Sequence, residues 1–499
     1  MALTPGGTLN SVPASQAVAL NTNYIDFTAA GTAGWAQQYL PDLMEKEAEV
    51  FGNRTVSGFL SQVGAEESMT SDQVVWSEQG RLHLSYQGEI RHLTQESGGG
   101  AGGQLGIIFD IDGNALTATH GIRTNDMLLV SDSATTQRLL VTGFGATNDI
   151  INVQAYGATT LTNAGYTAAA TTAGTTATIT ILVYGSEYGK GVDGQAGNAA
   201  GPLASQPTHT SFTNKPIIIK DHYHINGSDT SQIGWVEVSG EDGTNGYLWY
   251  LKAEGETRMR FTDYLEMAMV ESEAGDFANT LADNFVSGAG NAFGTEGLFS
   301  AIQNRGNQAS GIDGTSAPAD LAEFDLILNE FDNQGAIEEN MIFCDRSVSL
   351  AMDDMLASMN SYGLGGTSYG VFNNSEDMAL NLGFSGFRRG SYDFYKSDWK
   401  YLNDKATRGS INARDLTSGV RGVFIPAGVS SVYDEMMGRN MKRPFLHVRY
   451  RASQTDDRRM KTWTTGSVGG NVTSDLDAMQ VHYLSERCLI TQGANNFML

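Results

Sequence analysis

The sequence predicts an α+β fold with a small all-β domain inserted into its first half. Three observations lead to this prediction. Short apolar strands separated by turn residues crowd residues 106–186, one long helical pattern covers Tyr247–Gly275, and helical and strand patterns alternate through the last third. A chain of 499 residues has room for about three domains or for one large elaborated domain.

The composition is that of a folded, strongly acidic protein. Hydrophobic residues make up 40% of the chain, which is enough for apolar cores. The 56 acidic and 31 basic residues give a net charge of −25, so nucleic-acid binding is disfavoured as the main task. A shell that encloses nucleic acid without gripping it would carry the same sign of charge. The 59 glycines are spread along the chain, which is typical of extended, assembled proteins.

Cysteines and termini point to no special compartment. Cys344 and Cys488 are too few for a disulfide framework or a thiolate zinc site, so we expect free thiols. The N-terminus lacks a basic region followed by an apolar core, so we expect no secretory signal. No run of about 18 apolar residues occurs, so we expect no membrane span.

Several local patterns order the first 186 residues. Residues 1–33 are small, polar and aperiodic, which predicts an extended arm, and a helix is expected over 35–52. Alternating residues on both sides of a Gln-Gly pair in 73–86 predict a strand hairpin. The glycine-rich run 98–106 predicts a boundary. The strands expected beyond it are DMLLVSD, QRLLVTGF, DIINVQAYG and ATITILVYG.

A strand is expected from Ile217 to Asn226, after a glycine-rich stretch at 185–201. The Asn-Gly pair at its end predicts a turn into a second strand within 231–240, so that the two form a hairpin. One face of the strand carries Ile217, Ile219, Asp221, Tyr223 and Ile225, and the other carries Ile218, Lys220, His222 and His224.

The strongest helical pattern in the chain runs from Tyr247 to Gly275. The predicted buried stripe consists of Leu248, Leu251, Gly255, Met259, Thr262, Leu265 and Met269. Because glycine is a poor helix residue, a kink or a close contact is expected at Gly255.

Helices and strands alternate in the last third. A helix is expected over 318–335, a buried strand over 340–345, and a second helix over 346–360 with Asp345 or Ser347 as its N-cap. Further strands are expected in YDFYKSDW and GVRGVFIPAG, and QVHYLSERCLITQG is expected to end the chain as a pair of strands.

His222 and His224 are the first candidates for a metal site, because both point to one side of the predicted strand. Lys220 shares their face, and no HExxH, CxxC or His/carboxylate cluster accompanies them. We therefore interpret them as the polar face of a hairpin.

No other motif indicates catalysis or a cofactor. FDIDGNALTA begins like a calcium loop at Asp110 and Asp112 but lacks the EF-hand spacing, so a turn is expected. The Walker, GxSxG and GxGxxG patterns have no convincing match, and the adjacent pairs Asp353–Asp354 and Asp456–Asp457 do not converge as a general acid and base must. We expect no enzymatic activity, no cofactor and no metal site.

One basic cluster opposes the acidic average. Eight basic residues lie within a stretch of 23, namely Arg439, Lys442, Arg443, Arg449, Arg451, Arg458, Arg459 and Lys461. In a monomer such a cluster is usually a solvated patch. In a chain of net charge −25 it could also meet the acidic surface of an identical neighbour, so these residues are candidates for contacts between subunits.

The order of these elements resembles the major capsid proteins of tailed bacteriophages, which have the Hong Kong 97 fold. FTNKPIIIKDHYHINGSDTSQIGWVEVSG followed by Tyr247–Gly275 is similar to the family's E-loop return strand and spine helix. ENMIFCDRSVSLAMDDML resembles its A-domain step, and SSVYDEMMGRNMKRPF and VHYLSERCLITQGANNFML resemble its return to the P domain. DQVVWSEQGRL before a β module is similar to family members with an inserted domain, and the acidity and arm resemble crAss-like phages.

This resemblance implies a domain order. The segments are an arm and helix at 1–60, a strand hairpin and linker at 61–105, an inserted all-β domain at 106–186, an E-loop at 187–245, a P domain with the spine helix at 246–335, an A domain at 336–435 and a return to the A and P domains at 436–499. Lys215 and Lys220 lie near the implied E-loop and join the contact candidates, but no asparagine can be matched for a covalent cross-link.

The resemblance also implies function and partners. The chain would assemble with itself into hexamers and pentamers of an icosahedral head, in the cytoplasm of a host bacterium, and would enclose double-stranded DNA without sequence-specific binding. Portal, head-decoration and scaffolding proteins are the implied partners, and no membrane is involved. Two alternatives remain open at this point: another repetitive virion component of the tail or head surface, and a β-rich carbohydrate-binding surface protein.

Overall fold

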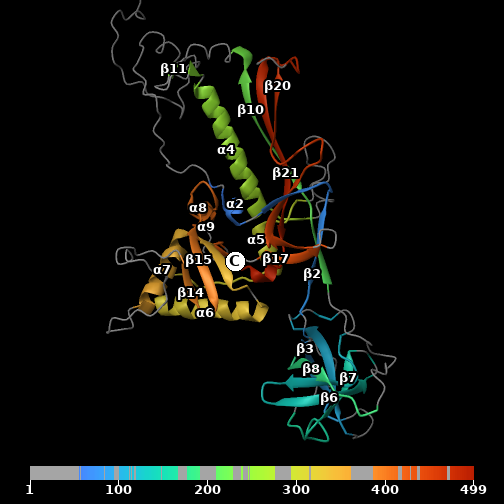
Figure 1. The fold of residues 1–499 in the computed structure, drawn as a ribbon. Helices are drawn as coiled ribbons and strands as arrows, with labels where there is room; N and C mark the ends of the chain where they lie inside the picture. Colours follow the sequence, from blue (N-terminus) through green and yellow to red (C-terminus); the bar gives the residue numbers. More distant parts are fainter. Residues whose placement is uncertain are drawn as a thin grey trace, which may run out of the picture. The chain divides into compact units, whose positions relative to one another are not determined.

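The computed structural model describes residues 56–499, except for 95–100, 117–119, 167–176, 192–208, 229–237, 240–244, 276–293, 361–385, 414–418, 435–438, 469–471 and a few single positions. The described residues are mixed α and β, as predicted, and belong to two compact units. The barrel unit is Trp76–Phe212, and the larger unit comprises Met1–Val75 and Thr213–Leu499 (Figure 1). The arm and the helix expected before residue 53, and much of the expected E-loop, lie outside the described residues.

The barrel unit is built around a closed barrel of six antiparallel strands in the order β3-β4-β7-β6-β5-β8. The strands are β3 (Ser85–His92), β4 (Gly103–Asp110), β5 (Asp126–Ser131), β6 (Thr136–Phe144), β7 (Ile150–Ala155) and β8 (Ile179–Ser186). Alternate residues such as Leu128, Leu139 and Ile151 point inward and are fully buried. The four predicted strands are confirmed as β5 to β8.

The predicted boundaries of this unit, 106 and 186, were too narrow. β3 pairs with both β4 and β8, so the barrel closes only with a strand that precedes the glycine-rich run. Residues 103–106 of that run form the start of β4, so the run is not a domain boundary. Gly88 serves this closure, because a Cβ there would collide with the carbonyl of Gly106 on β4.

The hairpin predicted over 73–86 is wrong. β2 (Val74–Gln79) pairs with β9 (His209–Asn214), and β3 belongs to the barrel. β2 and β9 are thus the strands at the two ends of the barrel unit. Local alternation identified the strands but not their partners, because pairing is decided over 130 residues of intervening chain.

The first sheet of the larger unit contains β1 (Ala65–Met69), β19 (Leu446–Arg451), β21 (Ala478–Thr491), β10 (Ile217–Asn226) and β20 (Lys461–Gly466). β1 is parallel to β19, and the other pairs are antiparallel. β21 is one strand of 14 residues, not the predicted pair. It pairs with β10 along one edge, and with β20 and β19 in succession along the other, so a break would leave one of these neighbours without a partner.

Most of the second strand predicted after Asn226-Gly227 lies outside the described residues. β10 pairs over ten residues with β21, and the short β11 (Val238–Ser239) pairs with β12 (Asn245–Gly246). The predicted division of faces on β10 is confirmed by its alternating burial.

Helix α4 (Leu248–Glu271) confirms the long helix and packs on β10 and β21 (Figure 1). The predicted stripe is confirmed at Leu265 and Met269, which are buried, and is wrong at Gly255 and Met259, which are exposed. Phe261, which the prediction omitted, is buried and stands four residues before Leu265. The prediction placed Met259 on the buried face of the helix, whereas the structure places Phe261 there, in contact with Val481 and Tyr483.

The second sheet has the order β14-β15-β13-β16. These strands are Gly386–Arg389, Tyr392–Asp398, Glu339–Cys344 and Gly422–Pro426 in that order. Helices α6 (Ala317–Gln334) and α7 (Arg346–Asn360) pack on one face of it (Figure 1). Asp345, one of the two predicted N-caps, caps α7 by accepting the N–H of Val348 at 2.8 Å. Gly335 ends α6 with φ 69°.

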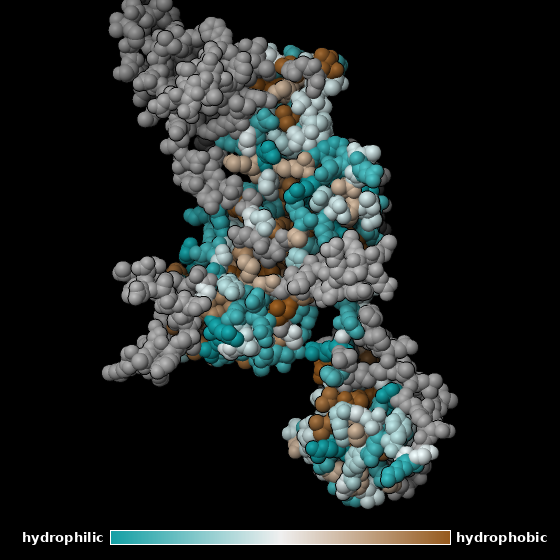
Figure 2. Space-filling view, in the orientation of Figure 1, coloured by the Kyte–Doolittle hydropathy of each residue, from teal (hydrophilic) through white to brown (hydrophobic). Residues whose placement is uncertain are grey.

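A third apolar core joins the two sheets. Phe59, Phe299, Trp399, Val423 and Leu489 belong to it, and the rings of Phe59 and Trp399 stack at 4.2 Å. The remaining elements are α2 (Phe59–Val63), α5 (Leu298–Arg305), α8 (Lys400–Asn403), α9 (Arg408–Asn412), β17 (Val429–Asp434), β18 (Arg439–Pro444) and the 3-10 turn Ala494–Asn496. Hydrophilic residues cover much of the coloured surface in Figure 2. Within the described residues, no helix combines the length and apolar character needed to cross a bilayer.

Candidate functional site

The predicted basic cluster is divided among three places in the larger unit. Arg439, Lys442 and Arg443 lie on β18, and their side chains are outside the described set. Arg449 and Arg451 lie on β19. Arg458 and Arg459 lie just before β20, and Lys461 is the first residue of β20. The structure thus brings five of the eight together on and beside the first sheet.

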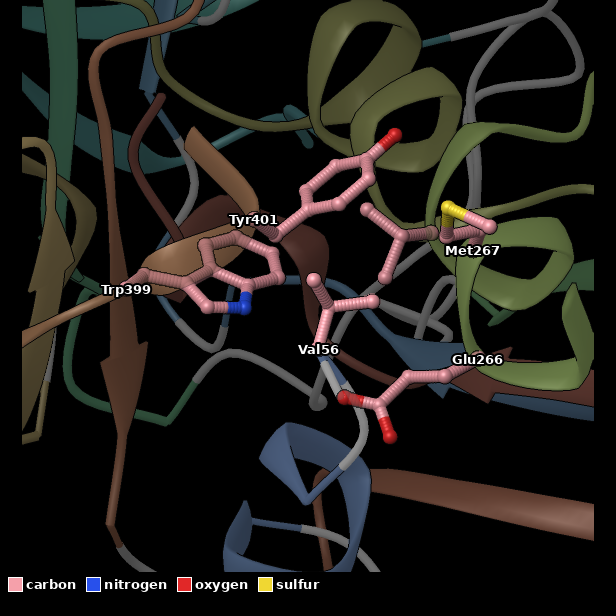
Figure 3. Close-up of a pocket in the computed structure, with 6 residues that line it drawn as sticks. Val56, Glu266, Met267, Trp399 and Tyr401 are labelled. Atoms are coloured by element: carbon pink, nitrogen blue, oxygen red, sulfur yellow. The ribbon is translucent and has the colours of Figure 1, made fainter. Parts of the chain in front are cut away.

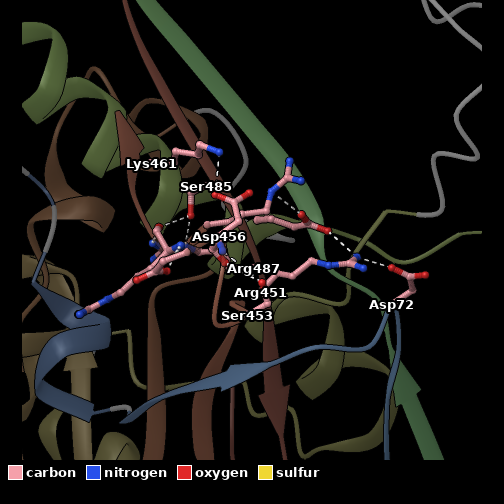
Figure 4. A network of polar contacts seen from close by, with 11 residues as sticks. Asp72, Arg451, Ser453, Asp456, Lys461, Ser485 and Arg487 are labelled. Carbon is pink, nitrogen blue, oxygen red and sulfur yellow. Dashed lines mark hydrogen bonds and ion pairs between the residues drawn. The ribbon is translucent and has the colours of Figure 1, made fainter. Parts of the chain in front are cut away.

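These five residues are paired with acids of the same chain. Glu486 on β21 accepts ion pairs from Arg451 at 3.1 Å and from Arg458 at 2.9 Å, and its own side chain is only 6% exposed (Figure 4). Arg451 also contacts Asp72, and Lys461 lies 2.6 Å from Asp456. Glu486 is therefore the acceptor around which this network is arranged.

The same network fastens the N-terminal strand β1. The parallel register places Glu67 beside Arg449, and their side chains pair at 2.7 Å. Glu66 pairs with Arg459 and also lies 3.8 Å from the buried Arg487. The pKa of Arg487 is lowered, mainly because the side chain is buried, and the nearby charge of Glu66 opposes that shift.

The electrostatic consequence is a nearly neutral patch. Each described member of the predicted cluster faces at least one carboxylate of its own chain, so its long-range attraction for an acidic neighbour is weak. The sequence could not show this, because Glu66, Glu67 and Asp72 lie more than 370 residues before their partners. Only the parallel pairing of β1 with β19 brings them together.

Lys215 and Lys220 lie at and near the start of β10. Lys220 is exposed on the face of β10 that points away from α4. Lys215 follows Asn214, a buried residue that the sequence did not single out. The amide of Asn214 donates to the carbonyl of Leu489 at 2.6 Å and to that of Glu296 at 3.1 Å. Asn214 therefore ties the start of β10 to β21 and to the residues before α5.

His222 and His224 also lie on this exposed face, but the ring beside His222 belongs to β21. His222 and His482 are directly opposite in the register, with ring centroids 6.0 Å apart and planes 27° apart. Ring nitrogens bind metals in the plane of the imidazole, so nearly parallel stacked rings do not converge on one ion. His224 instead bonds Asn226 and Gln480. Among the described residues, no group of three or more His, Cys, Asp and Glu could hold a metal.

A pocket beside α4 holds the junction between α2 and the long helix. Val56, Glu266, Met267, Val270, Trp399 and Tyr401 line it, and it leaves no room for a water molecule (Figure 3). The Glu266 carboxylate accepts the N–H groups of Gly58 at 2.7 Å and Phe59 at 2.8 Å, and so caps α2. Burial raises the pKa of Glu266, although these backbone donors oppose the shift.

The two thiols are buried and free, as expected. Burial raises the pKa of Cys344 and of Cys488 to about 12, so neither is a thiolate at neutral pH. Near Cys344, Lys396 pairs with Asp353 at 2.5 Å within the second sheet and α7. The candidate calcium loop forms a turn, in which Gly113 donates its N–H to the carbonyl of Asp110.

Comparison with known proteins gives matches to solved structures only. No protein-family model and no curated protein matches the chain. The asymmetric unit of the bacteriophage PhiM1 mature capsid is 8% identical and covers 92% of this chain and 91% of its own, with a TM-score of 0.36. The capsid structure of cyanophage P-SCSP1u is 8% identical over 95% of each chain, with a TM-score of 0.37. A chain from Microbacterium phage Oxtober96 is 9% identical over 95% of this chain and 98% of its own, with a TM-score of 0.36.

Proposed function

We propose that the chain is the major capsid protein of a tailed bacteriophage. It assembles with itself into hexamers and pentamers of an icosahedral head that encloses double-stranded DNA. In this proposal α4 is the spine helix, the first sheet is the core of the P domain, and the barrel unit is an inserted domain. The proposal retains the arm at 1–60, the E-loop at 187–245 and the return to the A and P domains at 436–499, as the resemblance implies.

The observation that carries the proposal is how the chain returns to its first sheet. β10 precedes α4 and the second sheet follows it. The chain then returns as β19, β20 and β21, of which β21 pairs with β10 and faces α4. This order of strand, long helix, separate sheet and returning strands is the one implied by the resemblance. α6 packs with α7 on the second sheet, so we assign it to the A domain, which then begins near residue 317 instead of 336.

The chemistry of the described residues supports a structural role. The buried Glu486 accepts ion pairs, the half-buried Glu266 caps a helix, and both thiols are buried. The net charge of −25 suits a lining over which packaged DNA is repelled and not bound.

Sedimentation velocity of the full chain tests the proposal. Because subunits of net charge −25 repel one another, assembly should increase as salt rises from about 0.05 M to about 0.5 M. We expect species far larger than hexamers at high salt. A monomer at every salt and protein concentration would count against self-assembly, and would favour a role as a tail or decoration component.

A further inference from the structure

We infer that the stacked rings of His222 and His482, on the same face as Lys220, form an acid-sensitive contact, which helps to hold β10 to β21 at neutral pH and weakens when both imidazoles carry a proton. The inference does not depend on the proposed function. It concerns how the strand before α4 is attached to the first sheet.

Three strands place these groups on one face. Cross-strand register sets His222 on β10 opposite His482 on β21, and Trp463 on β20 opposite His482. The His482 ring stacks on the Trp463 indole at 5.2 Å with planes 16° apart, and on the His222 ring at 6.0 Å. The result is a row of three stacked rings across β10, β21 and β20. It lies on the face opposite α4, whose contacts are Val481 and Tyr483.

The neutral row is well satisfied. The Nε2 atom of His482 lies 2.7 Å from the Thr465 hydroxyl, and stacked uncharged rings attract one another. His222 is exposed, and Trp463 is 37% exposed, so protons reach the row without any opening of the sheet.

The surroundings oppose a second proton. On β10, Lys220 and His224 lie two residues to either side of His222 on the same face. On β21 and β20, the flanking positions are Leu484, Gln480, Thr465 and Lys461, and Lys461 is paired with Asp456. Asp221 points to the other face, where it pairs with Arg260 of α4. Within the described residues, these neighbouring positions therefore offer the two imidazoles no carboxylate of their own.

Trp463 reduces the cost of protonating His482 but does not remove the repulsion between two protonated imidazoles. An indole face attracts one adjacent cation, so it favours a single imidazolium at His482. It does not contact His222, and two imidazolium groups 6.0 Å apart repel each other. Burial and then the charge of His222 lower the pKa of His482, so the folded protein holds fewer protons than the unfolded chain below the ordinary histidine pKa. Stability is therefore lost as the pH falls through that window.

Hydrogen exchange of the full chain tests the inference. Protection factors of the β10 amides, corrected for the intrinsic effect of pH, should fall about fivefold between about pH 7.5 and about pH 5, the size of one like-charge contact near the surface. The drop should disappear in His222→Gln and in His482→Gln. It should persist in the matched control His224→Gln, which lies one row away on the same strand and face. Equal protection at both pH values, or an equal drop in the His222→Gln/His482→Gln double variant, would overturn the inference.

Histidine titration by NMR gives a second readout that does not depend on strand opening. We expect the His482 signal to titrate at a higher pH in His222→Gln than in the unmodified chain, because the neighbouring charge is gone. An unchanged midpoint would show that the two rings do not interact electrostatically, and the inference would fail.

Discussion

Glu266 is a single carboxylate with two opposing effects on α2. Its oxygens cap the helix through Gly58 and Phe59, yet burial raises its pKa, so the ionised form carries a desolvation cost at neutral pH. A raised pKa in the folded state means that stability from this group is present below the ordinary glutamate pKa and is lost as the pH rises through the raised value.

Two variants separate these effects. Glu266→Ala removes the cap and should lower the free energy of unfolding by about 1–2 kcal/mol. Glu266→Gln keeps one acceptor oxygen and cannot ionise, so the unmodified chain should gain stability relative to it between about pH 7 and about pH 5. Thermal unfolding at both pH values measures this difference. The same difference at both values would mean that Glu266 does not titrate abnormally.

At the scale of elements, local patterns predicted what each segment is and failed to predict what it pairs with. The alternation in Ile217–Asn226 identified β10 and both of its faces, since a period of two is a local property. Its partner β21 lies about 260 residues further on and was replaced in the prediction by the nearest strand. Asp345 was predicted as a helix cap for the same local reason.

The candidate site shows the same division. The sequence identified the basic cluster because many basic residues lie close together in it. The acidic partners of Arg449, Arg451 and Arg459, on and after β1, could not be identified in this way, because they depend on the parallel pairing of β1 with β19. The stacked row of His222, His482 and Trp463 likewise exists only through the register of three strands. Nothing in the spacing of these residues indicates that they meet.

The barrel unit leads to a prediction about independent folding. Its apolar core contains residues from all six strands, and closure leaves no free strand edge in the barrel. A fragment of residues 76–212 should therefore fold alone, with a cooperative thermal transition and dispersed amide signals in NMR. A matching fragment of residues 103–186 keeps all of β4 but lacks β3, and should remain unfolded. If the shorter fragment folded equally well, β3 would be dispensable to the barrel.

At the scale of the whole molecule, the basic residues have to be assigned to contacts within or between subunits. Arg459→Glu breaks the pair with Glu66 and reverses an exposed charge, so it should reduce assembly in either case. The double variant Glu66→Arg/Arg459→Glu restores the pair inside the subunit without changing the net charge. Because Arg459 is paired with Glu66 of its own chain, we expect light scattering to show that the double variant recovers assembly. Assembly that stays poor in the double variant would instead assign Arg459 to a contact with a neighbour.

The central claim is that this chain builds a closed shell from copies of itself. Negative-stain electron microscopy of the full chain, expressed alone and brought to high salt, tests that claim most directly. The account predicts that the chain of 499 residues forms closed particles, or rings with six-fold and five-fold symmetry. Single subunits alone, or open assemblies without either ring, would contradict it.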